Sequence, residues 1–181
     1  MKLCLRTVAP VLVTLVALTA QARVTNVGSA SATFDVAGPG GMNIHGKTPD
    51  LVASEDAGKV EVKVALDHLT TGIGLRDQHM RDKYLEVGKY PNATVVVPRK
   101  SLHLPSAGKS SSGKVSGQMT IHGVTQLVTL TYTAKAHGKR VDVDGSTAVD
   151  MREYGIDVPS YLGVGVDPHV AINVAFEVVD K

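Results

Sequence analysis

Apolar and polar residues alternate along most of this 181-residue chain, and this rhythm restricts its fold more than any other feature. Successive side chains of a β-strand point to opposite sides, so a two-residue period indicates a strand with one buried face. The stretches with this rhythm are residues 33–36, 42–53, 60–66, 92–104, 114–122, 126–136, 140–151 and 170–178. Residues 24–32 are weakly patterned and indicate a frayed first strand. About eight strands, joined by short turns and not alternating with helices, predict an all-β antiparallel barrel or sandwich.

The rhythm stops once, between residues 70 and 91, where charged residues are concentrated. Two glycines there allow the backbone to turn. Residues 76–83 then predict a short helix, in which Asp77 and Arg81 have the favourable acid-first i,i+4 spacing. A single helix in an otherwise β chain either closes the end of a barrel or sandwich, or carries polar groups to a binding mouth. Further along, residues 153–168 are rich in Gly, Pro and Tyr and predict a long ordered loop.

The first 22 residues have the features of a secretory signal peptide. Lys2 and Arg6 form a basic start, residues 8–20 are apolar, and residues 20–22 read A-Q-A, which matches an A-x-A cleavage site. The apolar run is shorter than the roughly 20 residues that a membrane span needs. We therefore expect cleavage after residue 22, one mature domain of residues 23–181, a periplasmic or secreted location, and no stable membrane insertion.

The mature chain is close to neutral. Removing Lys2 and Arg6 from the 19 basic residues leaves 17, which equals the 17 acidic residues. No basic patch stands out in the sequence, so nucleic acid is not expected as a partner. Tryptophan is absent, and the chain has only two phenylalanines and five tyrosines. A pocket in this domain would therefore be lined mainly by aliphatic side chains and Met.

Three short motifs stand out within and after the interruption. Residues 76–80 read R-D-Q-H-M and are followed by K-Y-P at residues 89–91. Residues 117–125 read G-Q-M-T-I-H-G-V-T, and residues 152–156 read R-E-Y-G-I. In their sequence and order these motifs resemble signatures of the YceI-like family of secreted lipid-binding proteins. The resemblance extends over residues 33–178.

The resemblance implies a lipocalin-like, eight-stranded antiparallel β-barrel that holds an elongated apolar ligand. The ligand implied is a polyisoprenoid, an isoprenoid quinone or a similar amphiphilic lipid. The chain departs from the family pattern at residues 26–29, N-V-G-S, where an aspartate and then His-Ser are usual. It departs again at residues 38–41, G-P-G-G, which break a usually more continuous region. We therefore expect the barrel mouth near these residues to differ from that of the family.

The candidate ligand-binding residues lie in and just before the predicted helix and on the last strand. One side of a helical wheel carries Ile73, Met80 and Tyr84, and we expect it to face the interior as core packing or as an adaptable lid. The polar candidates would either contact ligand or hydrogen-bond to backbone and lock the helix. Locking is favoured, because polar groups at a barrel end must be satisfied. The polar candidates are Arg76, Asp77 and His79. The candidates on the last strand, whose inward side would form both the core and the pocket wall, are Ile172, Val174 and Phe176.

The sequence carries no recognisable catalytic or metal-binding motif. G-x-S-x-G is absent, the mature chain has no cysteine, and the seven histidines show neither H-x₃₋₅-H nor H-E-x-x-H spacing. We therefore expect no catalysis, no metal and no cofactor.

Two functions fit these observations. The first is a periplasmic or secreted binding protein that sequesters or carries an isoprenoid or similar long-chain lipid inside a barrel. The alternative is a non-catalytic β-domain with a filled core that acts through its surface as an interaction or adhesion module. A cavity of roughly several hundred Å³, the usual size of ligand pockets, would favour the first. The sequence leaves open whether the protein forms a homodimer.

Overall fold

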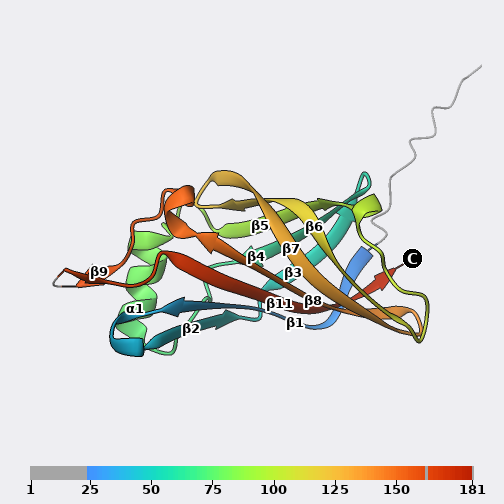
Figure 1. Ribbon diagram of the computed structural model, residues 1–181, viewed down its shortest axis with the longest axis horizontal. Coiled ribbons are helices and arrows are strands. Elements are labelled where there is room, and N and C mark those ends of the chain that lie inside the picture. Colours follow the sequence, from blue (N-terminus) through green and yellow to red (C-terminus); the bar gives the residue numbers. More distant parts are fainter. Residues whose placement is uncertain (1–23, 162, 181) are drawn as a thin grey trace, which may run out of the picture.

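The computed structural model of the protein describes residues 24–161 and 163–180 (Figure 1). The predicted signal peptide, residues 1–22, lies outside the described residues. The strands are β1 Val24–Ala37, β2 Asn43–Thr48, β3 Leu51–Asp56, β4 Lys59–Ala65, β5 Asn92–Pro98, β6 Ser110–Ile121, β7 Val124–His137, β8 Arg140–Asp150, β9 Ser160–Tyr161, β10 Val164–Gly165 and β11 His169–Asp180. The helices are α1 Gly74–His79 and the single turns η1 Pro39–Gly41, η2 Met80–Tyr84, η3 Arg99–Ser101 and η4 Met151–Tyr154.

Eight strands form a closed antiparallel barrel, which confirms the predicted fold class. Neighbours around the barrel are hydrogen-bonded in the order β1, β11, β8, β7, β6, β5, β4, β3. The ring closes where β3 returns to β1 through the pair Thr25 and Ser54. β2 pairs with the second half of β1. Because only Pro49 and Asp50 separate β2 from β3, the two form one interrupted strand beside β1.

Three departures from the predicted strands have a clear local cause. Residues 24–32, expected to be frayed, belong to β1 and pair with β11; their weak pattern reflects a bulge between Asn26 and Ala30, where Gly28 has a φ of +75°. The predicted strand at residues 42–53 is divided next to Pro49, which cannot donate a hydrogen bond to the ladder. The predicted strand at residues 92–104 ends at Pro98, and η3 follows it directly.

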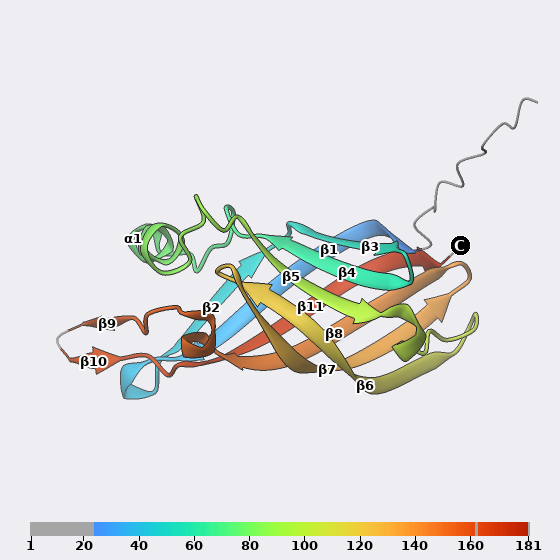
Figure 2. The ribbon, with the colours of Figure 1, turned by 90° about the horizontal axis from the view of Figure 1, so that it is seen from above.

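The predicted helix at residues 76–83 starts two residues earlier and has a widened last turn. α1 covers Gly74–His79, and η2, which continues it, is a π-helix of Met80–Tyr84. Such wide turns are rare and occur frequently at functional sites. We call residues 74–84 the plug. Its α1 part lies at the end of the barrel opposite to the C-terminus (Figures 1 and 2).

The barrel interior is filled at the end away from the plug, and we call this the filled half. Its buried side chains are Val24, Ala53, Val60, Val97, Val115, Tyr132, Ala134, Ala136, Val141 and Val178. The segment after η3 packs Leu102 and Leu104 against them. The buried carboxylate of Glu55 lies 3.4 Å from Arg99, so the charge buried at this end has a partner.

The predicted loop at residues 153–168 lies at the plug end of the molecule. It holds part of η4 and the small hairpin of β9 and β10, in which Val164 pairs with Tyr161 and Gly165 with Ser160. The hairpin projects beyond the barrel at the same end as α1, and the η1 turn between β1 and β2 lies there too (Figure 1). Three irregular segments therefore surround one end of the barrel: the η1 turn, the plug and the β9–β10 hairpin.

Candidate functional site

The plug half of the barrel encloses a cavity of about 700 Å³. The wall residues contributed by β1, β2, β4, β5, β6, β8 and β11 are Ala32, Thr33, Phe34, Val36, Ile44, Val64, Ala93, Ile121, Val149, Val170 and Ile172. Most of these side chains are short or β-branched. An eight-stranded barrel is just wide enough for side chains to fill it or for one small ligand to enter. Leu66, Leu69 and Leu85 from the segments on either side of the plug also line this half, and a space remains between them and the strands.

The cavity bears directly on the two functions that the sequence left open. A barrel filled throughout by its own side chains would contain no space of this size. A volume of about 700 Å³ lies within the range of roughly 300–1,000 Å³ that is usual for ligand pockets. The division into a filled half and a hollow half therefore favours a binding role over a purely structural core.

The plug forms one side of the cavity with residues that the sequence had singled out. The side of the helical wheel that was predicted to face the interior lines the cavity, with Ile73 half exposed at its opening. Arg76 and His79 reach the cavity wall as well. Six of the nine candidate residues line the cavity: Ile73, Arg76, His79, Met80, Tyr84 and Ile172. Their contact with a ligand stays a prediction.

The other three candidates lie outside the cavity wall. Phe176 packs in the filled half. Val174 packs against Gly145, with Cγ2 only 3.0 Å from the position that a Cβ would take there. Asp77 is 5% exposed and is turned toward the segment before the plug. Alternation identified the inward face of β11, but it carries no information on how far along the barrel the cavity extends.

Asp77 fixes the plug to the segment that precedes it. The Thr70 hydroxyl donates to one carboxylate oxygen (2.6 Å), and the Thr71 backbone N–H donates to the other (2.7 Å), which the Thr71 hydroxyl also contacts. Burial alone would raise the pKa of Asp77, but the hydrogen bonds from Thr70 and Thr71 outweigh it and lower the pKa to about 2. The group is therefore an ionised structural anchor at neutral pH.

Two arginines of the plug add to this attachment. Arg76 donates through Nε to the Thr71 hydroxyl (2.7 Å) and through Nη2 to the Thr71 carbonyl (3.1 Å). Arg81 donates to the carbonyl oxygen of Leu69 (3.0 Å). These contacts of Asp77 and Arg76 are the kind expected if the polar cluster locks the helix, which is the interpretation favoured above. Arg76 differs from Asp77 because it also lines the cavity.

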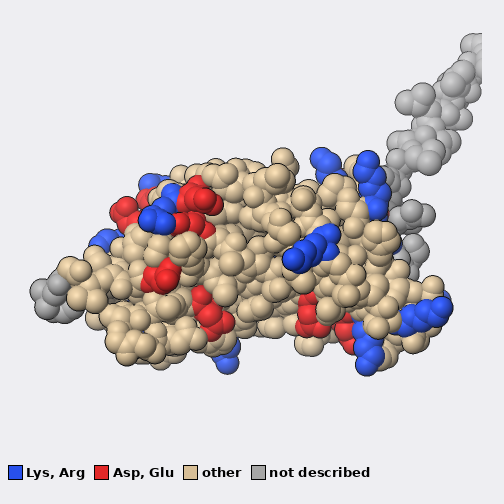
Figure 3. Space-filling model, in the orientation of Figure 1, with Lys and Arg blue, Asp and Glu red and all other residues tan. Residues whose placement is uncertain are grey.

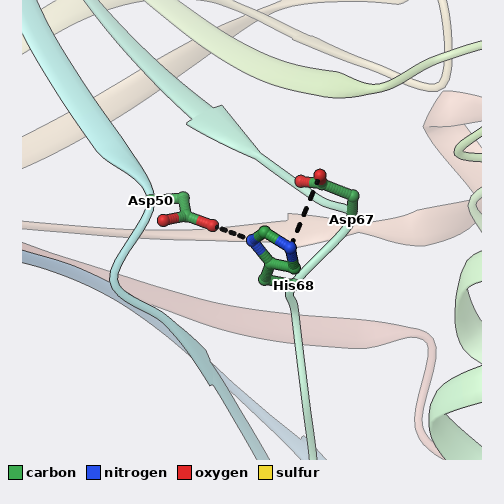
Figure 4. Close-up of side chains that lie close together, drawn as sticks. All are labelled: Asp50, Asp67 and His68. Carbon is green, nitrogen blue, oxygen red and sulfur yellow. Dashed lines mark hydrogen bonds and ion pairs between the residues drawn. The ribbon is translucent and has the colours of Figure 1, made fainter.

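A second polar cluster lies in the segment between β4 and the plug, where His68 stands between two carboxylates (Figure 4). Its Nδ1 is 2.6 Å from Asp50 Oδ2, and its Nε2 is 3.9 Å from Asp67 Oδ2. The hydrogen bond with Asp50 and the charge of Asp67 raise the pKa of His68. One ligand atom from each residue lies within 4.8 Å of the others, a spacing that a metal ion can use. Each ring nitrogen faces a different carboxylate, an arrangement that stabilises the protonated form of His68.

The three sequence motifs meet at the cavity end of the barrel. His122 lies in the two-residue turn between β6 and β7, and its ring is 4.7 Å from that of Tyr90 in an edge-on contact. Its Nε2 is 2.9 Å from Glu86 Oε2, and its Nδ1 is 3.2 Å from the carbonyl oxygen of Tyr154. The turn therefore joins the chain after the plug to η4. The sequence analysis identified the motifs but not the contacts between them. The His122-Gly123 dipeptide, which is typical of a turn, was the available signal for these contacts.

Sequence reasoning also missed the part of the wall that comes from irregular segments. Pro39 and Met42 near η1, and Pro159 and Val164 near the β9–β10 hairpin, all line the cavity. Loops have no periodicity from which an inward side could be inferred. The one signal was the G-P-G-G break at residues 38–41, which corresponds to the η1 turn at the mouth.

The cavity wall is almost wholly apolar. Within the described part of the chain, its only charged side chain is Arg76, and no Asp, Glu, Lys or Cys lines it. Such a wall can bury hydrocarbon and offers one cation and the imidazole of His79 at the plug. Elsewhere, basic and acidic side chains are interspersed over the face shown in Figure 3. None of the helices in residues 24–161 and 163–180 is long and apolar enough to cross a membrane.

Comparisons with known proteins agree with this architecture. A family model described as the YceI-like domain matches residues 19–178. The UPF0312 protein of Pseudomonas savastanoi pv. phaseolicola is 28% identical over 166 residues, which cover 84% of this chain and 82% of that protein. The UPF0312 protein of Pseudomonas fluorescens (strain SBW25) is 32% identical over 144 residues, which cover 72% of each.

Two solved structures share the fold at low sequence identity. One is a polyisoprenoid binding domain from Saccharophagus degradans implicated in plant cell wall breakdown, with a TM-score of 0.75 and 17% identity over 89% of this chain and 100% of that one. The other is BcnA of Burkholderia cenocepacia, with a TM-score of 0.65 and 16% identity over 82% of this chain and 95% of that one. At these identities the likeness is one of fold.

Proposed function

This chain belongs to the YceI-like domain family, and from that membership we propose that it binds an elongated apolar ligand inside its barrel. The ligand class is a polyisoprenoid, an isoprenoid quinone or a similar amphiphilic lipid. The observation that carries the proposal is the apolar cavity of about 700 Å³ beside the plug. The likeness in fold to a polyisoprenoid binding domain supports the same class of ligand.

The binding energy in such a site comes from burial of hydrocarbon. Each methylene removed from water contributes about 0.8 kcal/mol, which corresponds to about fourfold in affinity. A longer chain therefore binds more tightly until the cavity is full, and additional length then contributes nothing. The flexible Met80 side chain adapts the wall to branched or straight chains.

The position of the polar wall residues suggests how an amphiphile is oriented. Arg76 and His79 lie on the plug, whereas the strand residues on the wall are nearly all apolar. A polar end group would lie beside Arg76 and His79, with the hydrocarbon chain directed between the strands. Arg76 is held in place for this by its two hydrogen bonds to Thr71.

Binding, not catalysis, is the role that this wall supports. Acid–base catalysis commonly uses a histidine oriented by a partner group, and nucleophilic catalysis uses an activated hydroxyl or thiol. The wall offers Arg76 and His79 without an acidic partner among the described residues. We propose that the protein is exported through its signal peptide and sequesters or carries its lipid in the periplasm or outside the cell.

The test replaces two alanines with phenylalanine, one inside the cavity and one outside it. Ala93 lines the cavity, whereas Ala171 is exposed on the outer side of β11. We expect Ala93→Phe to weaken binding of a fluorescent prenyl lipid at least tenfold, because the ring takes the place of several methylenes of ligand. Ala171→Phe should bind like the wild type. Equal affinities for the wild type and both variants, with circular dichroism confirming folded barrels, would place the ligand outside this cavity.

A further inference from the structure

Apolar side chains are exposed in an uneven way on this protein. Among the described residues, six large apolar side chains are at least half exposed: Met42, Val52, Ile73, Leu75, Leu127 and Val164. Four of the six also line the cavity. Single exposed apolar residues are normal on a protein surface, but a contiguous group marks an interaction site.

The four cavity-lining residues come from all three irregular segments at the plug end. Met42 follows the η1 turn, Ile73 and Leu75 stand at the start of α1, and Val164 belongs to β10. We call these four residues the mouth rim. On the face shown in Figure 3, the described atoms next to the grey residue at this end are mostly uncharged, and charged side chains lie further along the molecule.

We propose that the mouth rim docks reversibly on the surface of a lipid bilayer, so that ligand passes between membrane and cavity. This inference rests on the proposed function, because it concerns how a water-insoluble ligand reaches the site. Each methylene that crosses water lowers the population in transit by about fourfold. An apolar rim that enters the bilayer surface gives the chain a continuous apolar path into the cavity.

The size of the rim favours a membrane over a second copy of the chain. Four half-exposed side chains present on the order of 400 Å², the size of a typical largest apolar patch on a monomer. A stable protein complex buries about 800 Å² on each partner. A bilayer needs no matching surface, since side chains that protrude from separate loops insert into it individually.

The charge near the rim indicates which lipids are needed. The plug has three basic residues, Arg76, Arg81 and Lys83, against the acidic Asp77 and Asp82. Residues 153–168, which hold the β9–β10 hairpin, add three acidic residues and no basic one. Because basic charge is not in excess here, apolar insertion is the main attraction. The protein should therefore bind neutral phosphatidylcholine vesicles, and added salt should have little effect.

The experiment is vesicle flotation of the lipid-free mature protein with phosphatidylcholine vesicles, using two matched pairs of variants. Leu75 on the rim is 65% exposed and Leu127, away from the cavity, is 76% exposed. Val164 on the rim is 55% exposed and Val52, away from the cavity, is 53% exposed. We expect Leu75→Asp and Val164→Asp to lower vesicle binding at least tenfold. Leu127→Asp and Val52→Asp should bind vesicles like the wild type.

Three results would overturn the docking inference. The first is a wild type that does not float with vesicles, and the second is an equal loss of binding in both members of a pair. A dimer in sedimentation that Leu75→Asp converts to a monomer would show that a second copy covers the rim. Titration with a short-chain fluorescent lipid, below the concentration at which it aggregates, separates this inference from the proposed function. A protein that binds this lipid but no vesicles refutes only docking, and one that binds vesicles but no lipid refutes only the cavity ligand.

Discussion

Asp77 shows how one buried carboxylate can hold a functional segment in place. Its two oxygens accept hydrogen bonds from Thr70 and Thr71, and those bonds keep its pKa at about 2 despite burial. The sequence indicated that this residue matters, because it belongs to a motif in the only charged interruption of the strand pattern. It could not show that the carboxylate faces the chain before the helix, since that depends on the path of residues 70–73.

Asp77→Asn should loosen the plug and change the pH dependence of stability. The amide offers one acceptor in place of a carboxylate, and buried donors left unpaired cost about 1–3 kcal/mol. A carboxyl with a pKa lowered from about 4 to about 2 stabilises the folded state above pH 4, and that contribution is lost as the pH falls toward 2. The variant should therefore be less stable at neutral pH and should lose less stability between pH 4 and pH 2.

Urea unfolding at a series of pH values measures both effects. Asp82→Asn is the control, because it removes a carboxylate from an exposed position of the same plug. If the two variants have the same stability and the same acid slope, the anchoring role of Asp77 is refuted.

At the scale of elements, the β6–β7 turn packs against the chain that follows the plug. Gly123 has a φ of +75°, and a Cβ on it would lie 2.6 Å from the Tyr90 ring. Gly123→Ala therefore meets both backbone strain and a clash and should destabilise the protein by more than about 1 kcal/mol. Gly138→Ala is the matched control, since its φ is +64° but nothing lies within 4 Å. Thermal unfolding should show a clearly larger loss for Gly123→Ala, and equal losses would mean that the Tyr90 contact contributes nothing.

The elements also show where sequence reasoning succeeds and where it stops. Each half-buried strand shows its own alternation of apolar and polar residues. Most strands of the barrel could therefore be predicted from the local sequence. The bulge at Gly28 and the break at Pro49 were missed because they interrupt alternation without ending the pairing of β1 with its neighbours. The position of the cavity depends on which side chains from distant strands meet, so Phe176 and Ile172 look equivalent in sequence but lie in different halves of the barrel.

At the scale of the whole molecule, the barrel has two ends with different roles. The filled half, with the buried Glu55 and the leucines after η3, provides a packed core. The plug half has a cavity, a plug held by polar anchors, and an apolar mouth rim. This division lets the fold remain stable while one end is hollow, because the packed half does not depend on a ligand. Family resemblance predicted the barrel and its class of ligand, and physical reasoning on the structure adds where the ligand would lie.

The central claim is that the cavity is occupied by an elongated apolar molecule in the native protein. The most direct measurement is mass spectrometry of an organic extract from mature protein purified from its native host without detergent. We predict one long-chain lipid, such as a polyisoprenoid or isoprenoid quinone, at about one molecule per barrel and strongly depleted in Ala93→Phe. An extract without lipid, together with no saturable binding of prenyl lipids by the purified protein, would contradict the claim.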